Sequence, residues 1–159
     1  MASIIADPAL VTGELMDAWA EDFDAWDICD QVCMNLFEKT PMAWDKVRQW
    51  STRDEEYVKR AAYALLACLA WHDKAAPDDS FIDLLPVIRA GADDGRNFVK
   101  KAVSWALRNI GKRNLRLHSE ALVLAHELGQ MDVRTARWIA NEVIRDLNTD
   151  ATRRRLALD

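Results

Sequence analysis

The feature that most constrains the fold is an internal repeat, because two segments of the chain match in order at an offset of 41 residues. Residues 57–66 and residues 98–107 each begin with an aromatic residue, Val and Lys, continue with a basic residue and Ala, and end with Leu. An amphipathic helical pattern follows each copy, and residues 132–147 form a weaker third copy. A helix pair that recurs at about 40 residues is typical of a stack in which each unit packs on its neighbours.

Apolar residues recur at helical spacing along the whole chain, without an alternating strand pattern or a β-hairpin turn signal. We expect helices at residues 8–21, 25–38, 41–51, 54–72, 80–92, 95–112, 115–129 and 132–147. The predicted fold class is therefore all-α, a HEAT-like helical-repeat α-solenoid, or α–α superhelix. We expect one domain over residues 1–159, with a helical core at residues 7–148 and a basic tail at residues 149–159.

The charge of the chain is unevenly distributed. The net charge is −5, which argues against a generic nucleic-acid binder. However, residues 1–56 contain 4 Lys or Arg and 13 Asp or Glu, whereas residues 57–159 contain 17 and 13. Residues 95–119 alone contain 7 Lys or Arg and no Asp or Glu. Such asymmetry allows an acidic protein to present a local cationic surface to a phosphate backbone.

This basic stretch predicts a helix with two different faces. Its apolar face is formed by Val99, Ala102, Val103, Ala106, Leu107 and Ile110. A second stripe at helical spacing contains Lys101, Trp105, Arg108 and Lys112. An indole among cations suits a nucleic-acid surface, since cations hold phosphates and the ring stacks on a sugar or base. A half-buried Trp surrounded by extended cationic side chains is an equally good interpretation.

The repeat predicts which other cations join this surface. Equivalent helices of a solenoid lie side by side, so Lys59 and Arg60 are expected beside Lys100 and Lys101. The predicted DNA-binding set takes cations from both copies and from the stripe, and adds Arg113: Lys59, Lys100, Lys101, Arg108, Lys112 and Arg113.

Other residue types indicate no special chemistry. Cys29, Cys33 and Cys68 have no partners at zinc-ligand spacing, so we expect buried free thiols and no metal site. The beginning of the sequence lacks the pattern of a signal peptide and no apolar run is long enough for a bilayer, which predicts a cytoplasmic protein without a membrane partner. Trp44, Trp50 and Trp71 are expected to be packing residues.

Trp26 and Asp30 share one face of a predicted helix, because they are four residues apart. Asp30 has two interpretations. It could cap a helix or pair with Arg60, or it could stabilise developing positive charge and position a water molecule.

These residues resemble the AlkD-type DNA alkylation-repair glycosylases. The resemblance rests on Trp26 and Asp30, on residues 58–61 and on residues 98–108, which occur in the family's order, and it extends over about residues 15–147. It implies a HEAT-like solenoid that hydrolyses the N-glycosidic bond of cationic N3- or N7-alkylpurines in double-stranded DNA, as part of base-excision repair. No metal, organic cofactor or obligate protein partner is implied.

The resemblance also implies roles for individual residues. Asp30 would be the catalytic carboxylate, Trp26 and Trp105 the aromatic walls against the deoxyribose and backbone, and Arg60 the cation that holds a phosphate. Members of the family have further helices before the Trp26 motif, whereas only about 20 residues precede it here, so the DNA groove is expected to be open at that end.

Two alternatives remain open from the residues. The first is a non-catalytic HEAT module that binds DNA or damaged DNA. The second is a protein-interaction solenoid, which the acid-free cationic stretch favours least.

Overall fold

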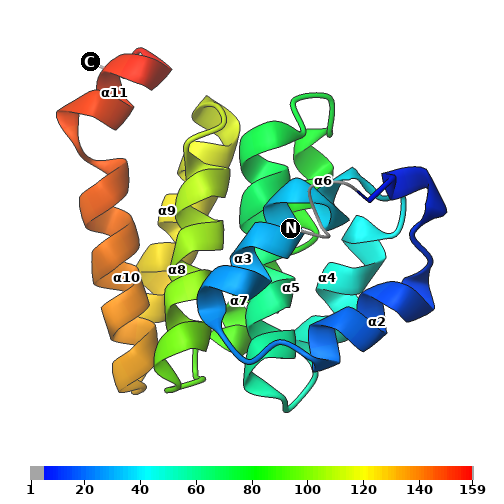
Figure 1. Cartoon of the computed structure of the whole chain (residues 1–159). Coiled ribbons are helices and arrows are strands. Elements are labelled where there is room, and N and C mark those ends of the chain that lie inside the picture. The colour runs from blue at the N-terminus through cyan, green and yellow to red at the C-terminus, as the bar shows by residue number, and fades with distance from the viewer. Residues whose placement is uncertain (1–5, 159) are drawn as a thin grey trace.

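The computed structural model describes residues 6–158, and every regular element within them is helical (Figure 1). The chain begins with a 3-10 turn at Pro8–Leu10, α2 (Gly13–Glu21), α3 (Trp26–Asn35), a 3-10 turn at Phe37–Lys39 and α4 (Ala43–Ser51). It continues with α5 (Glu56–His72), α6 (Asp78–Ile82), α7 (Leu85–Gly91), α8 (Asn97–Gly111), α9 (Leu115–Gln130), α10 (Arg134–Leu147) and α11 (Asp150–Leu156). No helix of residues 6–158 has the length and apolar character needed to cross a membrane.

Helices α3, α5, α8 and α10 pack in sequence and form what we term the parallel row. The direction of α3 relative to α5 follows from two thiols. Cys29 Sγ lies 3.7 Å from Tyr57 O, and Cys33 Sγ lies 3.7 Å from Ala61 O. The acceptors are one turn apart in the same order as the thiols, so the two helices run in the same direction.

The two copies of the sequence repeat occupy α5 and α8, which are neighbours in the row. The first aromatic residues of the copies, Tyr57 and Phe98, have ring centroids 5.8 Å apart. Near the other end, Asn109 Nδ2 donates to Ala67 O at 3.0 Å. The contacts follow the same order on both helices, so these helices are parallel as well. Equivalent positions of the repeat therefore lie beside each other, as the 41-residue offset predicts.

Helices α4, α6, α7 and α9 form a second layer. Helix α4 connects α3 to α5, helices α6 and α7 connect α5 to α8, and α9 connects α8 to α10. Within this layer, α4 contacts α7, and both α6 and α7 contact α9. Two layers of helices, linked by short turns, are the architecture expected for stacked helix pairs.

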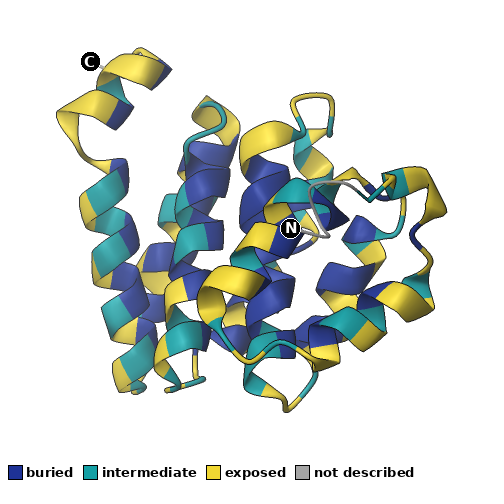
Figure 2. Ribbon diagram, viewed as in Figure 1, coloured by how far each residue is buried: buried dark blue, intermediate teal, exposed yellow. Residues whose placement is uncertain are grey.

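The core lies between these layers and between neighbours in the row, where Figure 2 shows the buried parts of α5, α8 and α10. Helix α5 is buried almost completely from Ala61 to Ala70, because other helices cover it on several sides. Its alanines allow these neighbours to approach closely. In α8 the six apolar residues of the predicted stripe are all buried, so this prediction is confirmed.

Three predicted helices are interrupted in the structure. Residues 8–21 contain a 3-10 turn before α2, and Thr12 caps α2 by accepting from Leu15 N. Residues 25–38 divide into α3 and a 3-10 turn, with Leu36 in a non-helical conformation between them. Residues 80–92 divide into α6 and α7, where Pro86 lies in the first turn of α7 and has no N–H to donate. The predicted basic tail contains α11, which Thr149 caps.

Two glycines show how closely the helices pack. A Cβ on Gly91 would overlap the hydroxyl of buried Tyr63, whereas a Cβ on Gly129 would lie 3.6 Å from Ala140 Cβ, an ordinary contact. We expect Gly91→Ala to lower the free energy of unfolding by about 1–3 kcal/mol through overpacking. Gly129→Ala is the matched control, and it should leave the stability unchanged or raise it by up to about 1 kcal/mol. Urea denaturation measures both, and equal effects would contradict the packing described here.

Candidate nucleic-acid interface

A buried ion pair connects the first three helices of the parallel row. Arg60 Nε lies 3.0 Å from Asp30 Oδ1, and Arg60 Nη2 lies 2.7 Å from Asp30 Oδ2. Arg60 Nη1 donates to Phe98 O at 2.5 Å. The side chains are 7% and 16% exposed for Arg60 and Asp30, respectively. One guanidinium on α5 thus fixes a carboxylate of α3 and the first turn of α8.

The surroundings of Asp30 include groups that raise its pKa and groups that lower it. Burial raises the pKa of the Asp30 carboxyl above its ordinary value, and this effect is the largest. The hydrogen bonds and positive charge of Arg60 lower the pKa, while the charge of Asp27 raises it. The carboxylate is therefore held in place by Arg60 but has lost part of its hydration.

Trp26 adds an aromatic surface to this pair. Its side chain is 50% exposed, and the Arg60 guanidinium carbon lies 5.8 Å from the centre of its ring. Trp26 and Asp30 are one turn apart on α3, as the sequence predicts. The structure therefore brings together three of the four predicted catalytic residues: Trp26, Asp30 and Arg60.

The fourth, Trp105, is half-buried on α8 and lines a separate hollow of about 230 Å³. We call this space the apolar hollow. It is lined by Met34 of α3, by Cys68, Trp71 and His72 of α5, and by Trp105. Met34 follows Asp30 by one turn of α3, so the apolar hollow opens next to the ion pair along the same face of the row.

The predicted DNA-binding cations are less available than the sequence indicates. Lys59 Nζ lies 3.2 Å from Asp94, and Lys112 Nζ lies 2.5 Å from Asp146. Arg108 lies 3.8 Å from Asp146. Asp94 also pairs with Arg96, so the acid-free stretch receives its acidic partners from just outside the stretch and from α10, which the local composition did not reveal.

Two further cations of the set are arranged differently. Lys100 Nζ lies 4.8 Å from the centre of the Trp138 ring, a cation–π geometry across α8 and α10. Lys101 is exposed, and within residues 6–158 it has no ion-pair partner. Lys101 is consequently the member of the predicted stripe that is best placed to contact a phosphate.

Arg113 has a structural position. Its Nη1 donates to Ala70 O at 2.8 Å, its Nη2 donates to Ala76 O at 3.3 Å, and its guanidinium carbon lies 4.3 Å from the centre of the Phe81 ring. These contacts hold the connection between α5 and α6. Two of its nitrogens therefore donate to this protein's own backbone, whereas the sequence predicts that Arg113 contacts DNA.

The prediction for the three packing tryptophans is correct for two of them. Trp50 is buried, and Trp44 packs edge-on against Phe81. Trp71, however, is 56% exposed. It follows Arg60 by 11 residues, which is three helical turns and places both on one face of α5. Because Arg60 is buried on this face, the spacing does not identify Trp71 as a surface residue, and its exposure follows from which helices pack beside it.

The thiols occupy apolar positions. Cys29, Cys33 and Cys68 are buried and unbridged, and burial raises the pKa of the Cys68 thiol. All three therefore pack as small apolar residues. Within residues 6–158, no group of His, Cys, Asp and Glu side chains is arranged to hold a metal ion.

Comparisons with known proteins agree with this architecture. The family model described as DNA alkylation repair enzyme matches residues 6–147. Comparison with curated protein sequences gives no match.

A solved structure reported under "A new family of proteins related to the HEAT-like repeat DNA glycosylases with affinity for branched DNA structures" aligns with a TM-score of 0.70 at 21% identity over 91% of this chain. A designed armadillo repeat protein in complex with the peptide (KR)4 aligns with a TM-score of 0.51 at 15% identity over 94% of this chain. This chain spans 66% of the length of each of them. The predicted HEAT-like helical-repeat fold is confirmed.

The buried ion pair predicts a strong coupling. Arg60→Met leaves the largely buried Asp30 carboxylate without a partner, and we expect it to lower the free energy of unfolding by about 3 kcal/mol. The double variant with Asp30→Asn should lose less than the sum of the two single variants, because it contains no unpaired charge. Urea denaturation of the four proteins measures this coupling.

The control is Arg53→Gln, which removes an exposed guanidinium that pairs with Glu21 and Glu55 and should change the stability little. Additive effects of the Asp30 and Arg60 substitutions would contradict the coupling.

Proposed function

The chain belongs to the DNA alkylation repair enzyme family, and on this basis we propose that it hydrolyses the N-glycosidic bond of cationic N3- or N7-alkylpurines in double-stranded DNA. The observation that carries the proposal is the Asp30 carboxylate, which Arg60 orients beside the exposed indole of Trp26. This step would begin base-excision repair.

Asp30 has the capacity for such a role. A carboxylate offers about four lone-pair positions, and Arg60 occupies one on each oxygen. The remaining ones can face a deoxyribose or accept from a water molecule. Since burial has removed part of the hydration of Asp30, its charge acts more strongly on a nearby cation than it would in water.

The reaction balances without a cofactor. The bond between C1′ and the purine nitrogen breaks, and its electron pair leaves with the purine, which becomes neutral. The sugar becomes an oxocarbenium-like cation that Asp30 stabilises. Water adds to C1′ and gives up a proton to Asp30 or to solvent, which leaves a hydroxyl group at an abasic site. Because the alkylated base is already positively charged, the leaving group requires no general acid.

Trp26 and Lys101 have supporting roles in this proposal. The exposed indole of Trp26 offers an electron-rich face to a cationic sugar or base. Lys101 offers an unpaired ammonium group to the phosphate backbone on α8. Lys59, Arg108 and Lys112 already pair with carboxylates, so their contribution to DNA binding requires a rearrangement of these pairs.

The first test is the release of 7-methylguanine and 3-methyladenine from methylated duplex DNA, measured by chromatography. Asp30→Asn should reduce the rate of release by at least about 100-fold, which is the scale of a carboxylate that acts in the transition state. The matched control is Asp27→Asn, which removes an exposed carboxylate from the first turn of the same helix and should preserve the rate. Equal rates for wild type and Asp30→Asn would contradict the catalytic role.

The pH dependence provides a second test. The reaction needs ionised Asp30, and burial raises its pKa, so the rate should fall with decreasing pH at values above the ordinary Asp pKa of about 3.9. The measurement is single-turnover release against pH, with circular dichroism to show that the protein stays folded. If the rate fell only at pH values at or below the ordinary Asp pKa, the hydrogen bonds from Arg60 would outweigh the effect of burial on the pKa of Asp30.

A second candidate function is DNA binding without cleavage. It is favoured by the engagement of both Asp30 oxygens with Arg60 and by the stated affinity of the structurally similar proteins for branched DNA. A folded wild-type protein that binds a four-way junction but releases no base at high enzyme concentration would support this alternative and overturn the glycosylase.

A further inference from the structure

Trp71 forms a wall of two different hollows. On one side is the apolar hollow, where Trp71 and Trp105 are two of the lining residues. On the other side is a small space of about 20 Å³ that we call the cationic hollow. It is lined by Ala70, Trp71, Lys74, Asn109, Lys112, Arg113 and Arg155. Four cationic side chains thus meet at one edge of an exposed indole.

These cations come from three parts of the chain. Lys74 follows the end of α5, Lys112 and Arg113 lie at the end of α8, and Arg155 belongs to α11. The negative ends of α5 and α8 favour nearby cations. Arg155, however, is brought to this place only because α11 turns back toward the parallel row. Figure 1 shows α11 bent away from the direction of α10 at the end of the molecule.

The cations of the hollow are only partly neutralised. Lys112 pairs with Asp146, and Arg113 interacts with the charges of Asp73 and Asp78. Within the described part of the chain, the side chains of Lys74 and Arg155 have neither an ion pair nor a hydrogen bond.

Two observations indicate that an anion would be favourable at this place. Burial and the positive charges of Arg113 and Arg155 lower the pKa of Lys74 below its ordinary value. The Nε–H group of Arg113 is buried without an acceptor. A phosphate oxygen beside Lys74 and Arg155 would relieve the repulsion among the cations.

The apolar hollow has the complementary character. Its lining is almost entirely apolar, and its volume of about 230 Å³ exceeds the roughly 150 Å³ of a protein cavity that holds benzene. The polar group at its edge is His72, whose Nδ1 lies 2.8 Å from Glu38 and is therefore already paired. The space has room for an aromatic ring but offers little hydrogen bonding to the edge of a base.

We propose that the two hollows together bind one unpaired nucleotide of a DNA strand, with its base between Trp71 and Trp105 and a phosphate against Lys74 and Arg155. Trp71 lines both spaces, so they are neighbours, as a base and its backbone phosphate are on either side of one sugar. Recognition is independent of sequence, since every base has a face that stacks on an indole. The inference rests on the proposed DNA binding and deepens it, because an unpaired nucleotide is available at a gap, a branch or a disrupted pair.

The test compares two fluorescently labelled DNAs in anisotropy titrations: a fully paired duplex and the same duplex with a short single-stranded gap. The wild-type protein should bind the gapped DNA at least about fivefold more tightly, the lower end of the effect of one stacked base. Trp71→Ala should abolish this preference and leave the affinity for the paired duplex unchanged. Trp71→Phe, which keeps an aromatic face, should retain most of it. Because Trp71 is 56% exposed, its replacement leaves the core intact.

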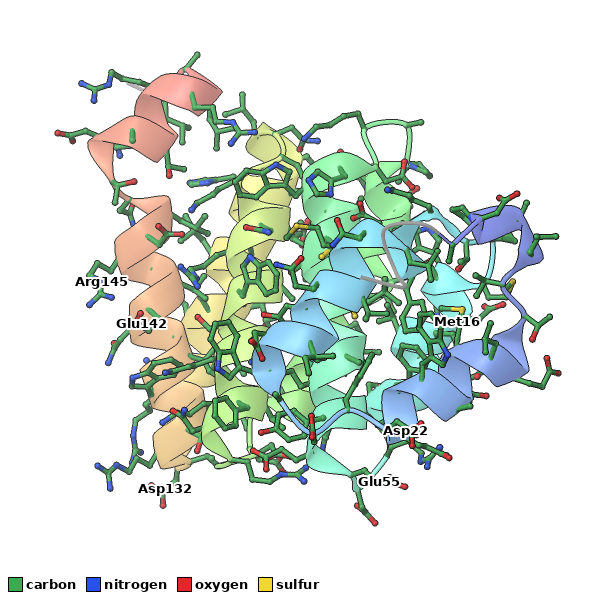
Figure 3. All side chains as sticks on the ribbon, viewed as in Figure 1. Met16, Asp22, Glu55, Asp132, Glu142 and Arg145 are labelled. Carbon is green, nitrogen blue, oxygen red and sulfur yellow. The ribbon has the colours of Figure 1, made fainter. Side chains whose placement is uncertain are left out.

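The role of the two cations toward phosphate is tested by salt dependence. The double variant Lys74→Gln, Arg155→Gln should weaken the binding of gapped DNA and reduce the slope of log K against log salt by about one for each phosphate that the variant no longer neutralises. Arg145→Gln, which removes one positive charge from the surface, is the control. Its side chain is 73% exposed, pairs with Glu142 and points away from α8 in Figure 3, so gapped-DNA binding should be unchanged.

The outcomes separate this inference from the proposed function. Binding of both DNAs with equal affinity, or a gap preference that survives Trp71→Ala, would overturn the inference and leave the proposed function standing. The absence of binding to any DNA would overturn both. Inorganic phosphate at constant ionic strength should compete with gapped DNA. Phosphate that bound at the cationic hollow without any effect on the gap preference would show a site for free phosphate only and would overturn the nucleotide site.

Discussion

The guanidinium group of Arg60 is the constraint on which the rest of the site depends. A buried cation must be paired and hydrogen-bonded, because the loss of its hydration is costly. Arg60 satisfies this requirement with both oxygens of Asp30 and with Phe98 O, so that one side chain connects α3, α5 and α8. The requirement fixes how far these helices can slide past one another. The same bonds that pair Asp30 also orient it, so its structural role is compatible with the chemical role that we propose.

The distribution of charge limits how such a surface can recognise DNA. The whole chain is acidic, and Asp94 and Asp146 neutralise several of the cations that the basic stretch contributes. We therefore expect binding through a broad field of positive charge to be weak. What remains accessible are individual cations, such as Lys101, and the exposed indoles of Trp26 and Trp71. A surface of this kind favours features that expose a base or a sugar over the regular backbone of an intact duplex.

The apolar hollow follows from the packing of the parallel row. Trp71 lies on the α5 face that also carries Arg60, although at Trp71 the face reaches solvent instead of another helix. The indole therefore stands beside Met34 and Trp105 without closing the space between them. Beyond Trp71, the turn of α11 places Arg155 where α5 and α8 end. Aromatic and cationic surfaces thus become neighbours through residues that are distant in the chain.

The sequence by itself determined the helical class, the 41-residue repeat with its parallel copies, the buried face of α8 and the shared face of Trp26 and Asp30. These properties follow from helical periodicity and from matches between segments, and both can be read from the order of the residues. It left open whether Asp30 would meet Arg60, and it missed the breaks at Leu36 and Pro86. It also assigned Trp71 to the core and counted as available several cations that are paired. Only the tertiary structure decided these points, because the partner of a charge and the exposure of an indole depend on which distant helices pack beside them, and no local pattern of residues specifies that.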